Sequence, residues 1–112
     1  METAEYNRSI TGALKNAFDQ AYVEWAHKPI GFIGYGGVGA SRAIEHARTI
    51  AIELQMVPVR SAVHISGGDY IMVVHKRQPM EQIEASILSS ANEMLDQMMW
   101  WGRVTKLGRD GQ

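Results

Sequence analysis

The 112-residue sequence has no cysteine, no long apolar run and almost no net charge. Without cysteine it can form no disulfide, no thiolate metal site and no cysteine nucleophile. A formal net charge of -1 argues against nucleic acid or an anionic membrane surface as the main partner. No apolar run approaches the roughly 20 residues that a membrane-spanning helix needs. These absences predict a soluble, cytoplasmic protein, and the length predicts one domain.

Clustered metal ligands are also lacking. The four histidines share no spacing typical of a metal site, so we expect no metal and interpret them as surface or helix-end residues. They are His27, His46, His64 and His75.

The clearest positive pattern is a glycine-rich loop between a strand and a helix. Residues 30–35 are apolar on both faces, which is typical of an internal parallel strand. The loop 34–39 follows, and residues 43–54 then place apolar side chains at helical spacing, with Ser41 as the expected N-cap. A helix N-terminus in this position suits a phosphate group or the polar edge of a flavin.

The rest of the chain is assigned by the same periodicities. An amphipathic helix is predicted from Ser9, as its N-cap, to Trp25, and an edge strand over 57–65. A long helix is predicted to begin at Pro79. The remaining segments are expected to lack regular structure: residues 1–8, a turn at 66–69, a loop at 70–75 and a frayed tail from Leu107 to Gln112.

This order of elements predicts an α/β fold with a parallel sheet. An internal strand at 30–35 needs a neighbour on each side, and the pattern supplies one confident partner. Two parallel strands alone are marginally stable. The pattern therefore predicts that strands are missing, and that the chain is either the C-terminal part of a larger doubly wound domain or is completed by another subunit.

The glycine loop permits several interpretations. Residues 34–39 match G-x-G-x-x-G between a strand and a helix, as in a dinucleotide-binding Rossmann fragment. However, the strand at 57–65 ends in His64-Ile65-Ser66, without the acidic residue that holds a ribose. The glycines can also serve close packing alone.

Two ordered motifs give the chain a more specific resemblance. The stretch Glu5-Tyr6-Asn7-Arg8-Ser9 continues to Leu14-Lys15-Asn16-Ala17 and Asp19, and Lys28-Pro29 leads through an apolar strand to Tyr35-Gly36-Gly37-Val38-Gly39 and then Arg42-Ala43. With both motifs in this order, the sequence resembles the NADPH-dependent FMN reductase family of flavodoxin-like folds over almost its whole length.

The resemblance implies a truncated flavodoxin-like three-layer parallel sheet, with about two strands and three helices of the full domain. Residues 1–112 would form its C-terminal part, because the family's first strands and Ser/Thr-rich phosphate loop should precede Glu5. It also implies that FMN and NADPH are the cofactors. One wall of the flavin site would be Glu5, Tyr6, Asn7, Arg8 and Ser9, and the second Tyr35, Gly36, Gly37, Val38 and Gly39.

The implied reaction is hydride transfer from NADPH to the flavin, with electrons passed to a quinone, azo, metal or flavin acceptor. No catalytic side chain is assigned, because the cofactor supplies the chemistry. Apolar residues near Met98 and Trp100 exceed one helix stripe, which predicts a homo-oligomer. Two alternatives stay open: a non-catalytic module that pairs with a full-length partner, and a Rossmann-type nucleotide-binding fragment.

Overall fold

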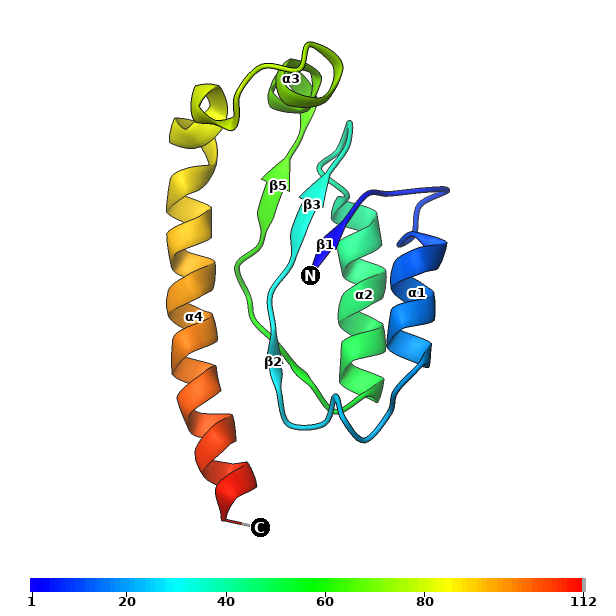
Figure 1. The fold of residues 1–112 in the computed structure, drawn as a ribbon, viewed down its shortest axis with the longest axis vertical. Helices are drawn as coiled ribbons and strands as arrows, with labels where there is room; N and C mark the ends of the chain where they lie inside the picture. Colours follow the sequence, from blue (N-terminus) through cyan, green and yellow to red (C-terminus); the bar gives the residue numbers. More distant parts are fainter. Residues whose placement is uncertain (112) are drawn as a thin grey trace.

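The computed structural model describes residues 1–111 and is an α/β fold built on short parallel strands (Figure 1). Strands β1 (Glu2–Thr3), β3 (Ile33–Tyr35) and β5 (Val63–Ile65) form one parallel sheet in the order β1-β3-β5, and β2 (Pro29–Ile30) pairs with β4 (Val57–Pro58) in a second. The parallel α/β prediction is confirmed. The expected count of about two strands is too low, because each expected strand is divided in two and a fifth strand precedes them.

A bulge divides the two expected strands. Ile30 pairs with Pro58 and Ile33 pairs with Val63. Between these two pairs the first strand advances by three residues and the second by five, so the second strand bulges. Hydrogen bonds between backbone atoms continue across the break, from Val59 N to Ile30 O and from Val63 N to Phe32 O. The Arg48 guanidinium donates to the carbonyls of Val59 and Arg60, which satisfies acceptors that the bulge leaves without a strand partner.

The first residues form a strand, although this segment has no periodicity that predicts one. Glu2 and Thr3 pair in parallel with Ile33 and Gly34. The terminal ammonium of Met1 donates to Gly31 O at 2.8 Å, and Ile33 N donates to Met1 O at 2.8 Å. The expectation that residues 1–8 lack structure is therefore wrong. The long-range pairing gives β3 a neighbour at both edges, as an internal strand requires.

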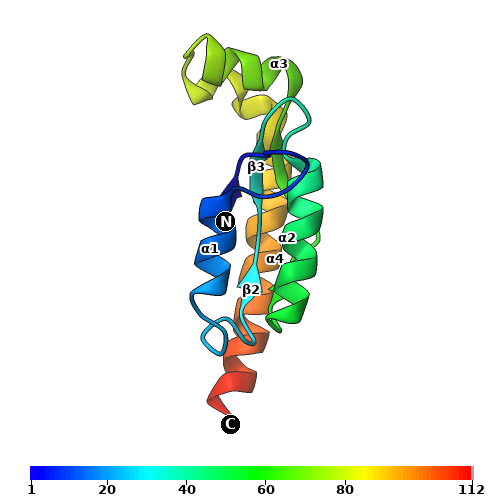
Figure 2. The same ribbon diagram turned by 90° about the vertical axis from the view of Figure 1, so that its right-hand side faces the viewer.

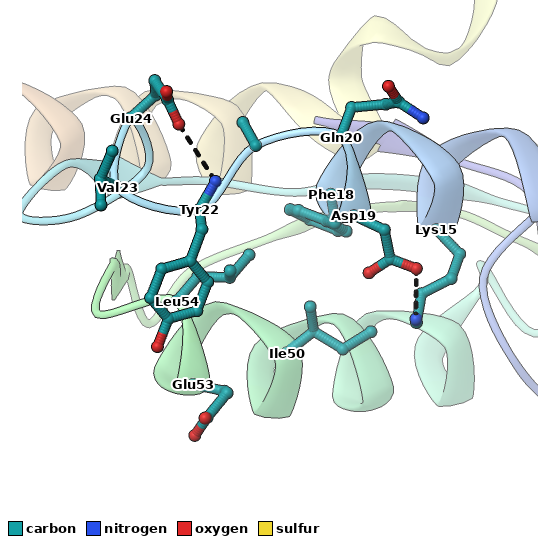
Figure 3. Close-up of a pocket in the computed structure, with 11 residues that line it drawn as sticks. Lys15, Phe18, Asp19, Gln20, Tyr22, Val23, Glu24, Ile50, Glu53 and Leu54 are labelled. Carbon is teal, nitrogen blue, oxygen red and sulfur yellow. Dashed lines mark hydrogen bonds and ion pairs between the residues drawn. The ribbon is translucent and has the colours of Figure 1, made fainter.

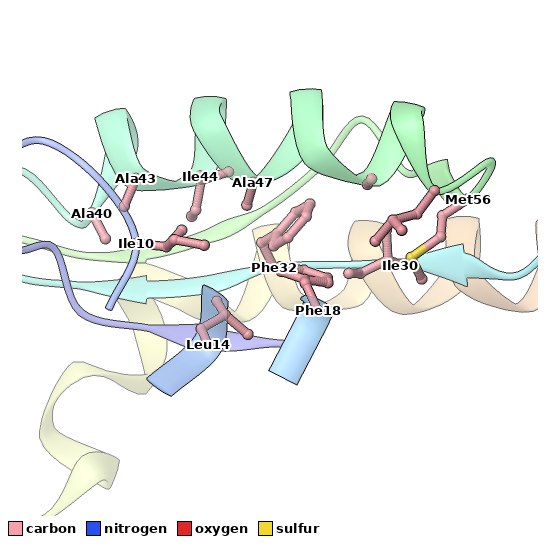
Figure 4. Packing of buried hydrophobic residues seen from close by; sticks show 12 residues of the cluster. Ile10, Leu14, Phe18, Ile30, Phe32, Ala40, Ala43, Ile44, Ala47 and Met56 are labelled. Carbon is pink, nitrogen blue, oxygen red and sulfur yellow. The ribbon is translucent and has the colours of Figure 1, made fainter. Parts of the chain in front are cut away.

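Helices cover the two faces of the sheet unequally (Figures 1 and 2). Helices α1 (Gly12–Asp19) and α2 (Ser41–Glu53) pack on one face, where Phe18, Phe32 and Ile44 are almost wholly buried (Figure 4). Helix α4 (Glu84–Asp110) packs on the other face, over a smaller cluster that includes Val59, Ile83 and Met94. The result is the three-layer arrangement that a flavodoxin-like fold requires.

Helix α1 is shorter than its sequence pattern indicates. Its N-cap is Thr11, whose hydroxyl accepts from Leu14 N at 3.1 Å, so the expectation of a Ser9 cap is wrong. The helix ends at Asp19 because the chain turns back: the Trp25 indole donates to Phe18 O at 3.2 Å, and the two rings meet edge to face at 5.9 Å. Tertiary packing of Trp25 therefore overrides the helical spacing.

Two further expectations fail towards the C-terminus. Residues 67–75 are helical, with α3 (Gly67–Tyr70) followed by a π-helix at Ile71–His75, because Tyr70, Met72 and Val73 pack against the α4-side cluster. A 3₁₀ turn (Met80–Ile83) precedes α4, which continues to Asp110 with a Lys106–Asp110 ion pair in its last turn. The predicted tail is thus helical to that point, and Gln112 lies outside the described residues. Within residues 1–111, no helix combines the length and apolar character needed to cross a bilayer.

Candidate functional site

Both predicted walls of the site lie at the carboxyl edge of the three-stranded sheet. Residues 5–9 follow β1, and residues 36–39 follow its parallel neighbour β3. Parallel neighbours end at the same edge, so the two loops leave the sheet together (Figure 1). Open α/β sheets bind their ligands at this edge.

A single carboxylate joins the two loops. Glu5 accepts hydrogen bonds from the backbone N–H groups of Arg42 and Ala43, each at 3.1 Å, and from Arg42 Nε at 2.6 Å. Its side chain is 7% exposed, whereas that of Arg42 is 46% exposed. Residue 5 therefore caps helix α2 from 37 positions earlier in the chain.

This contact corrects two expectations. Ser41 is not the N-cap of α2: Ala40 occupies that position in the left-handed conformation, without a side-chain cap of its own. The helix N-terminus is also not open to a phosphate group, because two of its free N–H groups already donate to Glu5. The Glu5 carboxylate therefore occupies the helix N-terminus, where the glycine loop predicted a bound phosphate.

The charge environment of Glu5 fits that role. Burial by itself raises the pKa of the carboxyl group, but the hydrogen bonds from Arg42 and Ala43 and the charge of Arg42 outweigh burial, so the net shift is downward. Glu5 thus stays ionised at neutral pH and complements the positive end of the α2 dipole.

Residues 6–9 form a tight turn of the I′ kind. Tyr6 N donates to Ser9 O and Ser9 N to Tyr6 O, each at 3.1 Å. Asn7 and Arg8 both have positive φ, 52° and 70°, as a type I′ turn requires. For arginine this backbone region is strained, and such strain persists where the surroundings impose it. The corners of the turn, Asn7 and Arg8, and the Tyr6 side chain are exposed.

The glycine loop is fixed by close packing against β5. A Cβ atom on Gly39 would lie 2.7 Å from Cβ of His64, and the φ of Gly39 is +64°. Gly36 N donates to Ile65 O at 3.1 Å, and Gly67 N donates to Gly37 O at 3.2 Å. At Gly37, by contrast, a side chain would meet nothing within 4 Å. The loop therefore combines a closely packed glycine, Gly39, with open space at Gly37.

Two histidines support the site, a role that the sequence did not reveal. His64 donates from Nδ1 to Gly39 O at 2.7 Å, and His46 on α2 shares a 2.9 Å hydrogen bond with the Ser9 hydroxyl. Arg42, which bonds to Glu5, is the third supporting residue. No local signal could have found these contacts, because they join residues 25 to 37 positions apart.

The structure therefore brings most of the predicted residues to one edge, with distinct roles. Glu5 and Ser9 face inward and bond to α2, and Gly39 is buried against β5. Tyr6, Tyr35 and Val38 present apolar surface to solvent, 64%, 37% and 49% exposed. The site is thus an open surface of aromatic and apolar side chains with backbone groups between them.

A separate hollow lies between the C-terminal ends of α1 and α2 (Figure 3). It encloses about 600 Å³ over a floor of Phe18, Ile50 and Leu54, with Tyr22 and Glu53 at its rim. It is distant from the carboxyl edge along α2, whose N-terminus receives Glu5. Within residues 1–111, no group of three or more acidic or histidine side chains is placed to hold a metal ion.

Comparison with known proteins agrees with this geometry. The family model described as NADPH-dependent FMN reductase matches residues 1–69, more than half of the sequence. The chain belongs to this family. The matched residues include both walls of the site and end just beyond β5.

Individual family members give the same result. An NAD(P)H-dependent FMN reductase of Saccharomyces cerevisiae is 30% identical over 97 residues, which are 87% of this chain and 47% of that protein. A Nectria protein with the same description is 33% identical over 67 residues, 57% of this chain and 33% of its own length. An FMN-dependent NADPH-azoreductase of Staphylococcus haemolyticus is 34% identical over 70 residues, which are 61% of this chain and 37% of that protein. The chain thus spans between a third and a half of these relatives.

Proposed function

We propose that residues 5–9 and 35–39 bind the isoalloxazine ring of FMN, within an NADPH-dependent FMN reductase. The observation that carries the proposal is the Glu5 carboxylate on α2, which holds the two family motifs beside each other at the carboxyl edge. The names of the relatives support the choice of FMN and a nicotinamide cofactor.

The residues present fit the ring. Tyr6, Tyr35 and Val38 offer apolar faces to a flat heterocycle, and the open space at Gly37 lets a ring approach the backbone. The exposed amide of Asn7 can donate to or accept from the polar edge of the ring.

The residues do not fit the phosphate group at α2, because the N–H groups of Arg42 and Ala43 donate to Glu5. A second anion there would be repelled by Glu5. We therefore propose that residues 1–112 act as the C-terminal part of the flavodoxin-like domain, and that a Ser/Thr-rich loop supplied by other sequence holds the phosphate.

When bound, the flavin would supply the hydride chemistry, in which a hydride is taken from NADPH and electrons pass to a quinone, azo, metal or flavin acceptor. The chain's own residues orient and cover the ring. Glu5 fixes the spacing between the two loops, His46 holds Ser9 in place, and His64 holds the carbonyl of Gly39. None of these contacts needs a side chain that exchanges protons during the reaction.

The test is a fluorescence titration of riboflavin and of FMN with the full chain. Because only the ring is recognised, we expect both flavins to bind, with dissociation constants within about twofold of each other. Tyr35→Ala should weaken both by about three- to tenfold, the value of one aromatic contact. Tyr22→Ala removes another exposed tyrosine, in the α1–α2 hollow, and should change neither dissociation constant. Absence of binding by both flavins would refute the proposal.

A second candidate function is favoured by the free edge of the sheet. Among the described residues, β1 pairs with β3 on one side and with no strand on the other. Such an edge can accept a strand from another protein. The chain would then be a non-catalytic module that pairs with a full-length family member. Native mass spectrometry of the chain mixed with the Saccharomyces cerevisiae relative should show a mixed complex, and its absence would exclude this candidate.

A further inference from the structure

The hollow between the C-terminal ends of α1 and α2 has the size and lining of a small-molecule site (Figure 3). Its volume of about 600 Å³ lies within the range of roughly 300 to 1,000 Å³ that is typical of such sites. Phe18 is fully buried beneath it, and Ile50 and Leu54 of α2 complete an apolar floor. The Tyr22 ring stands at its edge and is 56% exposed, so a ligand can reach it.

The lining of this hollow carries an excess of negative charge. Three acids, Asp19, Glu24 and Glu53, border it against one cation, Lys15. The Lys15 ammonium is bonded to Asp19 at 2.7 Å, and Lys28, which lies outside the lining, donates to the carbonyl oxygen of Glu24 at 2.6 Å. Among the described residues, Glu53 forms no ion pair. An uncompensated carboxylate therefore remains at the rim.

Two helix dipoles add to this negative charge. Helix α1 ends at Asp19 and α2 ends at Glu53, so the negative ends of both helices adjoin the hollow. Neither helix has a basic residue in its last turn, where a cation would stabilise it. An acid at the last position is instead unfavourable for the helix. A cation bound in the hollow would offset this repulsion at both helix ends.

We propose that the hollow binds a small organic monocation with an aromatic body, such as a protonated arylalkylamine. The ring would lie on the apolar floor, and the ammonium group would lie at the rim, near the Tyr22 ring and the Glu53 carboxylate. A neutral ligand of the same shape would gain the apolar contact alone, and an anion would be repelled. The hollow is separate from residues 5–9 and 35–39, so failure of this proposal would leave the proposed function intact.

The test compares three probes that share an indole ring and differ in charge: tryptamine, tryptophol and indole-3-propionate. Each is titrated into the ¹⁵N-labelled full chain, and its dissociation constant is obtained from the backbone amide shifts. We expect the shifts at residues 19–24 and 50–54. Tryptamine should bind about tenfold more tightly than tryptophol, and indole-3-propionate more weakly than either. Added salt should reduce the preference for the cation.

Two variants separate the charge from the aromatic contact. Glu53→Gln removes the uncompensated charge, so it should weaken tryptamine binding by about three- to fivefold and leave tryptophol binding unchanged. Tyr22→Ala should weaken tryptamine binding by about threefold. Glu45→Gln is the matched control, because it removes the same charge from the same helix at a side chain that is 76% exposed and outside the lining. It should change neither dissociation constant.

The outcomes that would overturn the proposal are equally specific. They are equal affinity for the three probes, a preference that salt does not reduce, and the same loss in Glu45→Gln as in Glu53→Gln. Shifts at residues 5–9 and 35–39 would place the probe in the flavin site and would overturn it too. So would the absence of shifts at millimolar tryptamine. Circular dichroism of each variant confirms that it folds, and the comparison of the three probes on the wild-type chain needs no variant.

Discussion

The two faces of the sheet differ in how completely this chain covers them. On one face α1 and α2 enclose Phe18, Phe32 and four alanines at zero exposure. On the other, Met94 of α4 and the helical residues 70–73 pack over a smaller cluster that includes Val59 and Ile83, while Ile33 and Tyr35 remain beside an apolar groove. The first face is complete within residues 1–111, and the second depends on what packs against α4.

Apart from Tyr35, which lies beside the groove, the candidate site is held by the complete face. Glu5, Ser9 and the glycine loop all bond to α2 or to the strand end beside it. Their geometry is thus set by the best-packed part of the molecule. Six substitutions, grouped in four predictions, measure the contrast between the faces, from the largest expected effect to the smallest.

Phe32→Ala should lower the free energy of unfolding by about 4 kcal/mol, because it leaves a cavity in a fully enclosed layer. The Phe32 ring also lies 5.5 Å from the Arg48 guanidinium, and that contact is lost. Met94→Ala, on the other face, should cost about 2 kcal/mol, since Met94 borders the groove. Urea denaturation measures the free energy of unfolding of both variants. Equal losses would contradict the difference in packing between the two faces.

Gly34→Ala should cost about 3 kcal/mol. The added methyl group would overlap the carbonyl oxygen of Gly39 and lie 2.8 Å from Ile44 Cδ1, and neither the loop nor α2 can retreat easily. Gly31→Ala is the matched change on the α4 side, where the nearest atoms are in the flexible side chain of Met94, at 3.0 Å. It should cost less than about 1 kcal/mol. Thermal unfolding distinguishes the two, and a more damaging Gly31→Ala would reverse the assignment.

Glu5→Gln should cost about 1 to 2 kcal/mol at pH 7, because it removes the charge that caps α2 and pairs with the half-exposed Arg42. The folded-state pKa of Glu5 is lowered, so its stabilisation is fully present above the unfolded pKa of about 4.3 and is lost as pH falls through the lower folded value. The difference between wild type and variant should therefore shrink below about pH 4. A difference that stays constant down to pH 2 would show that the cap does not depend on ionisation.

Leu107→Asp should have the smallest effect, within about 0.5 kcal/mol, because its side chain is 77% exposed near the end of α4. Thermal unfolding at fixed protein concentration checks this value. A large loss would mean that this side of α4 is buried in solution.

Local periodicity was sufficient to predict the helices that bury an apolar stripe. It also predicted the strand, loop and helix around Gly34 to Gly39. Helix α2 and the start of the long C-terminal helix lie close to their expected positions. The two family motifs identified the family, which the comparison confirms.

Contacts between distant residues could not be predicted in this way. Strand β1 has two residues and exists through its pairing with β3, so it has no period to detect. The cap of α2 comes from Glu5, and no rule for adjacent residues would connect them. Residues 70–75 form an apolar run that fits a strand, a loop or a helix equally well by length, and their packing near α4 determines the outcome.

The central claim is that the carboxyl edge, between residues 5–9 and 35–39, binds the flavin ring. The most direct measurement is a titration of the ¹⁵N-labelled chain with FMN, followed by the chemical shifts of its backbone amides. We predict that the largest shifts occur at Tyr6, Asn7, Gly37 and Val38, with little change along residues 15–24. Shifts concentrated around the α1–α2 hollow, or no shifts at saturating FMN, would contradict the claim.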